Sequence, residues 1–281
     1  MQWGQIKTIF IFCFLILDIY LIMQVVTKEN EPPLITNPGT VSLEEELNER
    51  NINYENITNE TTNAAYISAT WHTFTEEEVE TLKDQEVLNN GNMIYSVFST
   101  PILLGKDRTA EEILLLLGDK VLHFEDYRYY RWNKENNTLL FFQQYEDKPL
   151  YYNNGGMIMF FLNDQYEVTS YAQTLQTNID DLSEEKELSK PLEIVKALLN
   201  QNKVFSGDRI TSMKLGYHTY FPVSETIQAF VPTWKVNVNE DEVYFVNAQD
   251  GQIIDINEDN FITNIKSEIN KMKSKFRSEE S

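Results

Sequence analysis

Residues 127–175 have the sequence YRYYRWNKENNTLLFFQQYEDKPLYYNNGGMIMFFLNDQYEVTSYAQTL, and this stretch decides the fold class. Runs rich in aromatic and β-branched residues alternate with clusters of Asn, Asp and Gly, which is typical of strands separated by turns. We predict strands at 127–132, 138–145, 157–162 and 166–175, with hairpin turns at 133–137 and 163–164. Consecutive strands joined by short turns form an antiparallel meander.

Two helices are predicted ahead of the meander from their capping boxes. In such a box a Thr side chain and a Glu three residues later satisfy free backbone N–H groups at the start of a helix. The tetrapeptides TEEE at 75–78 and TAEE at 109–112 fit this pattern. Helices should therefore begin at Glu76 and just after Thr109, and Gly118 should end the second one. A first α+β domain is predicted over 65–180.

A charged segment at 180–187, which lacks aromatic residues, separates this domain from a second one. Apolar residues at helical spacing predict a helix at 191–199. Alternating apolar and polar residues then predict strands at 234–238 and 243–247. A second α+β domain is thus predicted over 188–260. Both domains run from a helix into a meander, which favours a distant internal duplication.

The last segment, 261–281, carries an amphipathic pattern. Apolar residues recur at 3-4-3-4 spacing with basic residues between them, which predicts a helix over 261–277 and a short tail. The apolar positions are Ile262, Ile265, Ile269, Met272 and Phe276. Three interpretations remain open for this face: packing on its own domain, binding a partner, or lying on a membrane surface.

The N-terminal region contains a long apolar run. Residues 9–26 read IFIFCFLILDIYLIMQVV, in which only Asp18 and Gln24 are strongly polar. This length and composition predict a transmembrane helix over 9–27. The charged and proline-containing sequence that follows does not resemble a signal-peptide cleavage site. We therefore expect the helix to remain as an anchor.

The topology follows from the flanking charges. Lys7 precedes the predicted span, whereas acidic residues accompany Lys28 after it. We expect a short cytoplasmic tail at 1–8, with the bulk of the chain outside the cell membrane. Residues 28–64 are polar and contain Pro and Gly breakers, which is typical of a linker. The chain is thus predicted to be a single-pass membrane protein with two extracytoplasmic α+β domains.

One face of the predicted span suits a partner helix. Asp18 lies near mid-span, where an ionisable side chain costs about 2.5–3.5 kcal/mol and usually faces protein or water. It shares a stripe with residues at 3-4-3-4-3 spacing, as in the seam of a left-handed helix pair. The predicted partner-helix interface consists of Thr8, Ile11, Leu15, Asp18, Ile22 and Val25. The alternative is a protonated Asp18 tolerated in a passive anchor.

Composition excludes several classes of protein. The formal net charge of −21 and pI of about 4.5 argue against nucleic acid as a partner, because a phosphate backbone is held by clustered Lys and Arg. Cys13, in the apolar run, is the only cysteine, so the chain has neither an internal disulfide nor a zinc site made of cysteines. A disulfide-free ectodomain suits a bacterial envelope.

Motifs for catalysis or metal binding are weak. The three histidines show no helical His-x-x-x-His pair, and His72 with Glu76 forms only an isolated His-x-x-x-Glu. Residues 255–266 begin like a calcium loop but carry Asn260 and Lys266 where Gly and Glu are required. Neither a nucleophile elbow nor a phosphate-binding glycine loop is present. We therefore expect no enzymatic activity, no metal and no cofactor.

Several motifs together resemble the YycI (WalI) family. The N-terminal pattern Trp3-x-x-x-Lys7-Thr8-Ile9-Phe10, followed by Leu17-Asp18, is similar to the start of that family. The resemblance continues through 156–173 and 232–251. The last block is also similar to PepSY-type modules, which are small α+β domains of the bacterial envelope. A YycH/YycI-like ectodomain with a PepSY-like C-terminal unit is implied.

The resemblance also implies a function. Members of the YycI family are accessory membrane proteins of the WalK/WalR (YycG/YycF) two-component system, which controls cell-wall metabolism in Gram-positive bacteria. The leading hypothesis is a non-enzymatic regulator that contacts a WalK-like sensor histidine kinase and a YycH-like protein. The second hypothesis is an envelope module that is anchored by a passive helix and binds a ligand in an aromatic groove. A hydrolase is disfavoured, because no nucleophile–base pair is visible.

Overall fold

The computed structural model describes residues 42–279 except 56, 107 and 225, together with 14, 15, 17 and 18. The chain divides into a unit Met1–Glu46 and a compact unit Leu47–Ser281. The span predicted at 9–27 lies outside the described residues apart from those four, which are helical. Among the helices that are described, none is both long and apolar enough to cross a membrane.

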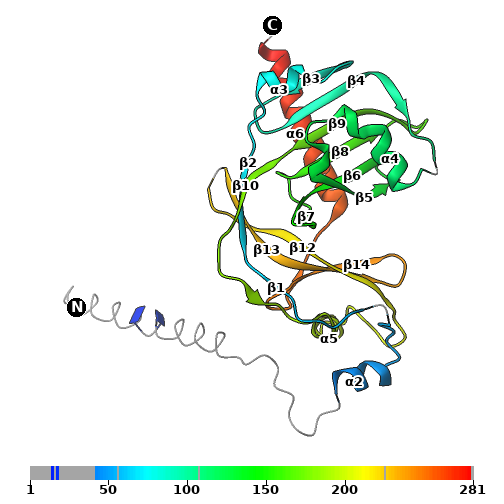
Figure 1. Ribbon diagram of the computed structural model, residues 1–281, viewed down its shortest axis with the longest axis vertical. Coiled ribbons are helices and arrows are strands. Elements are labelled where there is room, and N and C mark those ends of the chain that lie inside the picture. Colours follow the sequence, from blue (N-terminus) through cyan, green and yellow to red (C-terminus); the bar gives the residue numbers. More distant parts are fainter. Residues whose placement is uncertain are drawn as a thin grey trace, which may run out of the picture. The chain divides into compact units, whose positions relative to one another are not determined.

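The meander predicted from residues 127–175 is confirmed, and one further strand, β7, interrupts it (Figure 1). Its strands are β5 (Tyr127–Asn133), β6 (Thr138–Tyr145), β7 (Lys148–Tyr151), β8 (Met157–Leu162) and β9 (Glu167–Thr174). The sheet continues from β9 into β4 (Ile94–Leu103) and β3 (Gln85–Asn89), all antiparallel. We call this part, from β5 to β3, the first meander.

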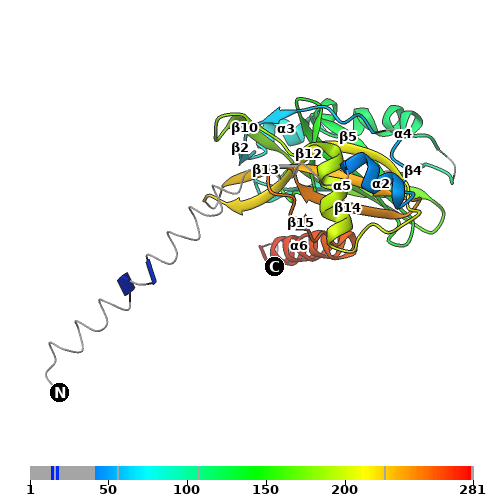
Figure 2. The same cartoon turned by 90° about the horizontal axis from the view of Figure 1, so that it is seen from below.

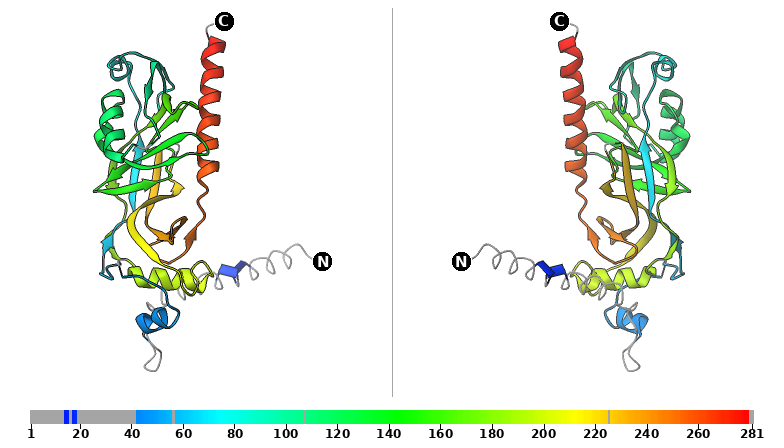
Figure 3. Two further views of the ribbon diagram at one scale, coloured as in Figure 1. Left: turned by 90° about the vertical axis from the view of Figure 1, so that its right-hand side faces the viewer. Right: turned by 90° about the vertical axis from the view of Figure 1, so that its left-hand side faces the viewer.

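Both faces of the first meander are covered, which explains why its strands β6 and β8 are largely apolar along their length. Leu139 and Phe141 of β6 point to a core that includes Ile113 of α4 (Ala110–Leu117). Their neighbours Leu140 and Phe142 point to the opposite core, against α6 (Glu258–Glu279). Figure 3 shows the two helices on opposite sides of the sheet.

The amphipathic helix predicted at the C-terminus is α6. Its apolar stripe packs within the chain, in a core formed by the first meander together with residues of β14 (Glu242–Asn247) and β15 (Ile253–Ile254), the strands that directly precede it. The buried members of the stripe are Ile262, Ile265, Ile269 and Met272, and Phe261 of the same helix is buried beside them. Figure 2 shows α6 along the lower edge of the strands, with α5 crossing in front of them.

A second group of strands is built around a long hairpin. The elements are β12 (Ile210–Pro222), β13 (Ile227–Val238), β14 (Glu242–Asn247), β15 (Ile253–Ile254), β2 (Ile67–Trp71), β10 (Gln176–Asp181) and α5 (Pro191–Asn200). The helix α5 and strands β13 and β14 confirm the elements predicted at 191–199, 234–238 and 243–247. Strand β2 pairs with both β10 and β13, so the chain ahead of the first meander is woven into this second group.

The two groups form one sheet of thirteen strands among the described residues, because β12 pairs in parallel with β7. A separate two-stranded sheet joins β1 (Asn63–Ala64) to β11 (Lys186–Glu187). The class is therefore α+β, with a large sheet and few helices. The proposed division into domains at 65–180 and 188–260 stays a prediction.

The two capping boxes are confirmed. Thr75 caps α3 (Glu76–Glu80) and Thr109 caps α4, each with its partner Glu at the third helical position. Gly118 follows α4 with a φ of −64°, and the chain continues as the short 3-10 helix η1 (Gly118–Lys120) before η2 (Phe124–Asp126). The segment expected to be linker contains α2 (Leu43–Glu49), because Ser42 and Glu45 form a further capping pair that the sequence reading overlooked.

Candidate functional site

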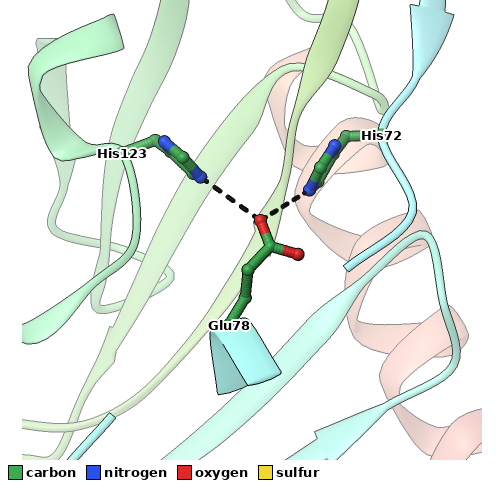
Figure 4. Close-up of side chains that lie close together, drawn as sticks. All are labelled: His72, Glu78 and His123. Carbon is green, nitrogen blue, oxygen red and sulfur yellow. Dashed lines mark hydrogen bonds and ion pairs between the residues drawn. The ribbon is translucent and has the colours of Figure 1, made fainter. Parts of the chain in front are cut away.

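Two histidines and a glutamate from three separate segments meet at one end of the first meander (Figure 4). His72 follows β2, Glu78 lies on α3, and His123 directly precedes η2. The Nε2 atom of His72 lies 2.9 Å from Oε1 of Glu78, and Nε2 of His123 lies 3.5 Å from the same oxygen. We call these three residues the His–Glu–His cluster.

The carboxylate of Glu78 is held by the start of its own helix. Thr75 donates to Oε2 from its backbone N–H (2.7 Å) and from its hydroxyl (2.9 Å), which leaves Oε1 to face the histidines. Partial burial raises the pKa of Glu78, but the hydrogen bonds from Thr75 and the two histidines outweigh it and lower the pKa to about 2. The carboxylate is therefore ionised at any physiological pH.

The two histidines are positioned through their backbones. The N–H of His72 donates to the carbonyl of Leu175 (2.8 Å), and the side chain of Gln173 donates to the carbonyl of Leu122, which precedes His123. Both anchors lie at the same end of β9. The backbone of His123 is left-handed, with φ of 49°, and the ring of His72 packs edge-on against buried Phe74.

The donor set defines what the cluster can do. The candidate ligand atoms, one from each residue, lie within 4.8 Å of one another. The side chains of His72 and Glu78 are 23% and 25% exposed, and that of His123 is 41% exposed, so the cluster is reachable from solvent. Two imidazoles and a carboxylate can share hydrogen bonds or bind a divalent metal. We expected no metal because the sequence has no metal-binding motif with local spacing. The three residues of the cluster come together only in the folded chain.

A second candidate site is a pocket of about 490 Å³ between β5, β6 and the β12–β13 hairpin. Aromatic rings and cations line it in a chain that is strongly acidic overall. Its lining residues include Tyr129, Tyr130, Phe142, Tyr151, Arg128, Lys214, Lys235 and Asp147. We call it the cationic pocket.

Two lysines of the cationic pocket lie directly opposite each other on neighbouring strands. Lys214 and Lys235 are paired residues of β12 and β13, an arrangement in which like charges are unfavourable. The ammonium group of Lys235 lies 4.2 Å from the centre of the Tyr130 ring. Burial, followed by the nearby charges of Lys214 and Arg131, lowers the pKa of Lys235 to about 8. An anionic ligand would relieve this repulsion.

The structure describes only part of the predicted partner-helix interface, and it gives His72 a different partner from the one considered in the sequence. Leu15 and Asp18 of the predicted partner-helix interface are helical and exposed, and Thr8, Ile11, Ile22 and Val25 lie outside the described residues. His72 contacts Glu78 rather than Glu76, because α3 begins only at residue 76 and turns Glu78 toward the histidine.

The cluster was missed because its members are far apart in sequence. His123 lies 45 residues after Glu78, and no local motif connects the two. The only available signal was the Glu of the capping box, which lies six residues after His72. In the loop that resembled a calcium site, Glu258 and Asp259 instead accept hydrogen bonds from Asn133 and Asn136.

Comparison with known protein families shows to which family the chain belongs. A family model described as YycI protein matches residues 35–249. The chain belongs to the YycI family. The match covers both groups of strands of this YycI-family protein except β15, so the resemblance noted in the sequence is confirmed. No curated protein sequence matches the chain.

Solved structures show more distant likenesses. An uncharacterized protein from Eubacterium rectale has 12% identity and a TM-score of 0.42, covering 73% of this chain and 89% of its own. YycH from Bacillus subtilis has 16% identity and a TM-score of 0.41, covering 72% and 54%. The C-terminal domain of Bacillus megaterium YpeB has 12% identity and a TM-score of 0.36, covering 76% and 95%. At such TM-scores these likenesses add nothing to the functional argument.

Proposed function

We propose that this YycI-family protein is a non-enzymatic, membrane-anchored regulator of a WalK-type sensor histidine kinase, acting with a YycH-like partner. Membership of the YycI family is the observation that carries the proposal. In the proposed mechanism, the protein makes more favourable contacts with one signalling state of the kinase than with the other, and so shifts the equilibrium between them. A coupling free energy of about 1–3 kcal/mol between two such sites is typical.

The contacts are proposed to run along the predicted span. Leu15 and Asp18 are three residues apart in a helical segment, so they share a face, whereas Leu17 points away from it. An aspartate on a membrane-embedded face is stabilised by a polar or charged group on a partner helix. The ectodomain would then couple events in the envelope to this helix pair.

Site-specific photo-crosslinking in native membranes tests the proposal. A crosslinker at Leu15 or Ile22 should capture a WalK-like kinase or a YycH-like protein, and the same crosslinker at Leu17 should capture much less. Asp18→Leu should reduce recovery of the partner in a pull-down. Equal capture from Leu15 and Leu17, or recovery of neither partner, would contradict the proposal.

The cationic pocket favours a second candidate function, that of an envelope module that binds an anionic ligand. Paired Lys214 and Lys235 beside Tyr130 provide charge and an aromatic face in one place. Lys235→Met keeps the side-chain length and removes the charge. This change should abolish binding of an anionic peptidoglycan fragment if the second function is correct.

Replacing the predicted span by an unrelated transmembrane helix separates the two functions. Under the regulator proposal, control of the kinase is lost in the exchanged chain. Under the ligand-binding proposal, the cellular phenotype survives the exchange but is lost in Lys235→Met.

A further inference from the structure

We propose that the His–Glu–His cluster binds a single divalent transition-metal ion, with zinc as the best fit. The ligands are Nε2 of His72, Oε1 of Glu78 and Nε2 of His123, and a water completes the site. This inference goes beyond the regulatory function and does not depend on it.

The distances fit this ion. Zinc bonds to His nitrogen and to carboxylate oxygen measure about 2.0–2.2 Å, so two ligand atoms of a tetrahedral site lie roughly 3.3–3.6 Å apart. The two histidine nitrogens lie 2.9 and 3.5 Å from Oε1 of Glu78, and the three ligand atoms are all within 4.8 Å of one another. For the two histidine–glutamate pairs, shifts of a few tenths of an ångström in the side chains would suffice.

The donor types narrow the choice of metal. Two imidazoles with one carboxylate suit zinc and other late first-row ions, whereas calcium and magnesium require mostly oxygen ligands. The carboxylate also supplies the negative charge that a divalent ion needs. Because His123 is 41% exposed, the fourth position is open to water.

The site is held in place before any ion arrives. Thr75 orients Glu78 through Oε2, which is the kind of outer hydrogen bond that fixes metal ligands in proteins. The backbones of His72 and Leu122 are tied to Leu175 and Gln173, at the end of the first meander. Binding would therefore cost little reorganisation.

A bound ion would connect elements that are distant in sequence. His72 directly follows β2, the strand that pairs with both β10 and β13, while Glu78 and His123 belong to α3 and to the η2 turn beside the first meander. The ion would thus clamp the end of the first meander at which β9 stops to the strand that enters the second group. We expect it to stabilise the fold rather than to act in catalysis.

Titration of the full chain with zinc chloride tests the inference. The protein is purified in detergent without a polyhistidine tag and carries Cys13→Ser, so that no thiol competes. Calorimetry should show one zinc ion per chain, a rise in Tm with zinc, and no comparable response to magnesium or calcium chloride. His123→Asn, which tolerates the left-handed backbone, and Glu78→Gln, which keeps the capping box, should each weaken binding at least tenfold.

Glu76→Gln is the matched control, because Glu76 is exposed on the same helix and outside the cluster. It should bind zinc like the parent chain. The inference is overturned if the parent chain binds no zinc at micromolar concentrations. It is overturned equally if His123→Asn, folded by circular dichroism, binds zinc as tightly as Glu76→Gln does.

Discussion

The carboxylate of Glu78 connects helix capping to the candidate metal site. One oxygen completes the capping box with Thr75, and the other faces His72 and His123. The residue type needed to start α3 is therefore also the one that the cluster uses. A capping signal in a sequence can thus conceal a ligand.

Thr75→Ala tests the structural part of this arrangement. The change removes the side-chain cap of α3 and one of the two donors to Oε2 of Glu78. The free energy of unfolding should fall by about 1 kcal/mol in urea denaturation. Thr73→Ala, at an exposed neighbour, should change it by less than about 0.5 kcal/mol. Equal effects of the two changes would show that the cap is unimportant.

His218 predicts a pH dependence of stability. Burial lowers its pKa below 6.5, against the opposing effect of its Nδ1–H bond to the carbonyl of Tyr151. Below pH 6.5 the unfolded chain therefore binds a proton that the folded chain resists, so stability falls as the pH drops from 7 to 5. His218→Asn keeps an N–H donor but cannot titrate. Its stability should fall less over this range, and an unchanged slope in urea denaturation would contradict the assignment.

At the scale of elements, the parallel contact between β7 and β12 joins the two groups of strands. Gly216 on β12 makes this close approach possible. A Cβ atom there would meet the ring of Tyr151 and lie 2.6 Å from the carbonyl oxygen of Pro149. That oxygen belongs to the backbone of β7 and cannot rotate away as a side chain can.

Gly216→Ala should therefore strain the junction, because β7 and β12 would be forced apart. Overpacking of this kind costs about 1–3 kcal/mol, measurable in urea. Lys214→Ala, at an exposed position of the same strand, is the control, and because it removes one member of an unfavourable like-charge pair it should not lower stability. A Gly216→Ala protein as stable as its parent would mean that the junction yields easily.

The elements that the sequence predicted well are those with strong local patterns. The strands β5, β6, β8 and β9 have apolar runs between turn residues, and α3 and α4 have capping boxes. Strand β7 was missed because it is four residues long, contains Pro149 and pairs as much with the distant strand β12 as with its neighbour β6. The His–Glu–His cluster was missed for a related reason, since only the folded chain brings His123 to Glu78.

On the scale of the whole molecule, the first meander is the centre of a three-layer arrangement. Helix α4 covers one face and α6, from the far end of the chain, covers the other. The C-terminal helix is thus part of the core of a sheet whose strands all come well before it in the sequence, the last of them ending at Thr174. Sequence alone could identify its apolar stripe but not the surface that receives it.

Ile265→Ala tests this packing. Ile265 is 1% exposed and lies among the residues that α6 buries against β6 and β8. Its truncation should leave a cavity and lower the free energy of unfolding by about 2–5 kcal/mol. Thr263→Ala, at an exposed position of the same helix, should have almost no effect. Similar denaturation curves for the two variants would show that α6 does not contribute to the core.

In the proposed regulatory function, the ectodomain and the predicted span act together to change the activity of the kinase. The most direct test is the autophosphorylation rate of a WalK-type kinase reconstituted in proteoliposomes, alone and with saturating full-length protein, together with its YycH-like partner. The proposal predicts a change in rate of about 5–150-fold, corresponding to a coupling of 1–3 kcal/mol, which Asp18→Leu diminishes. An autophosphorylation rate that is the same with and without the protein would contradict it.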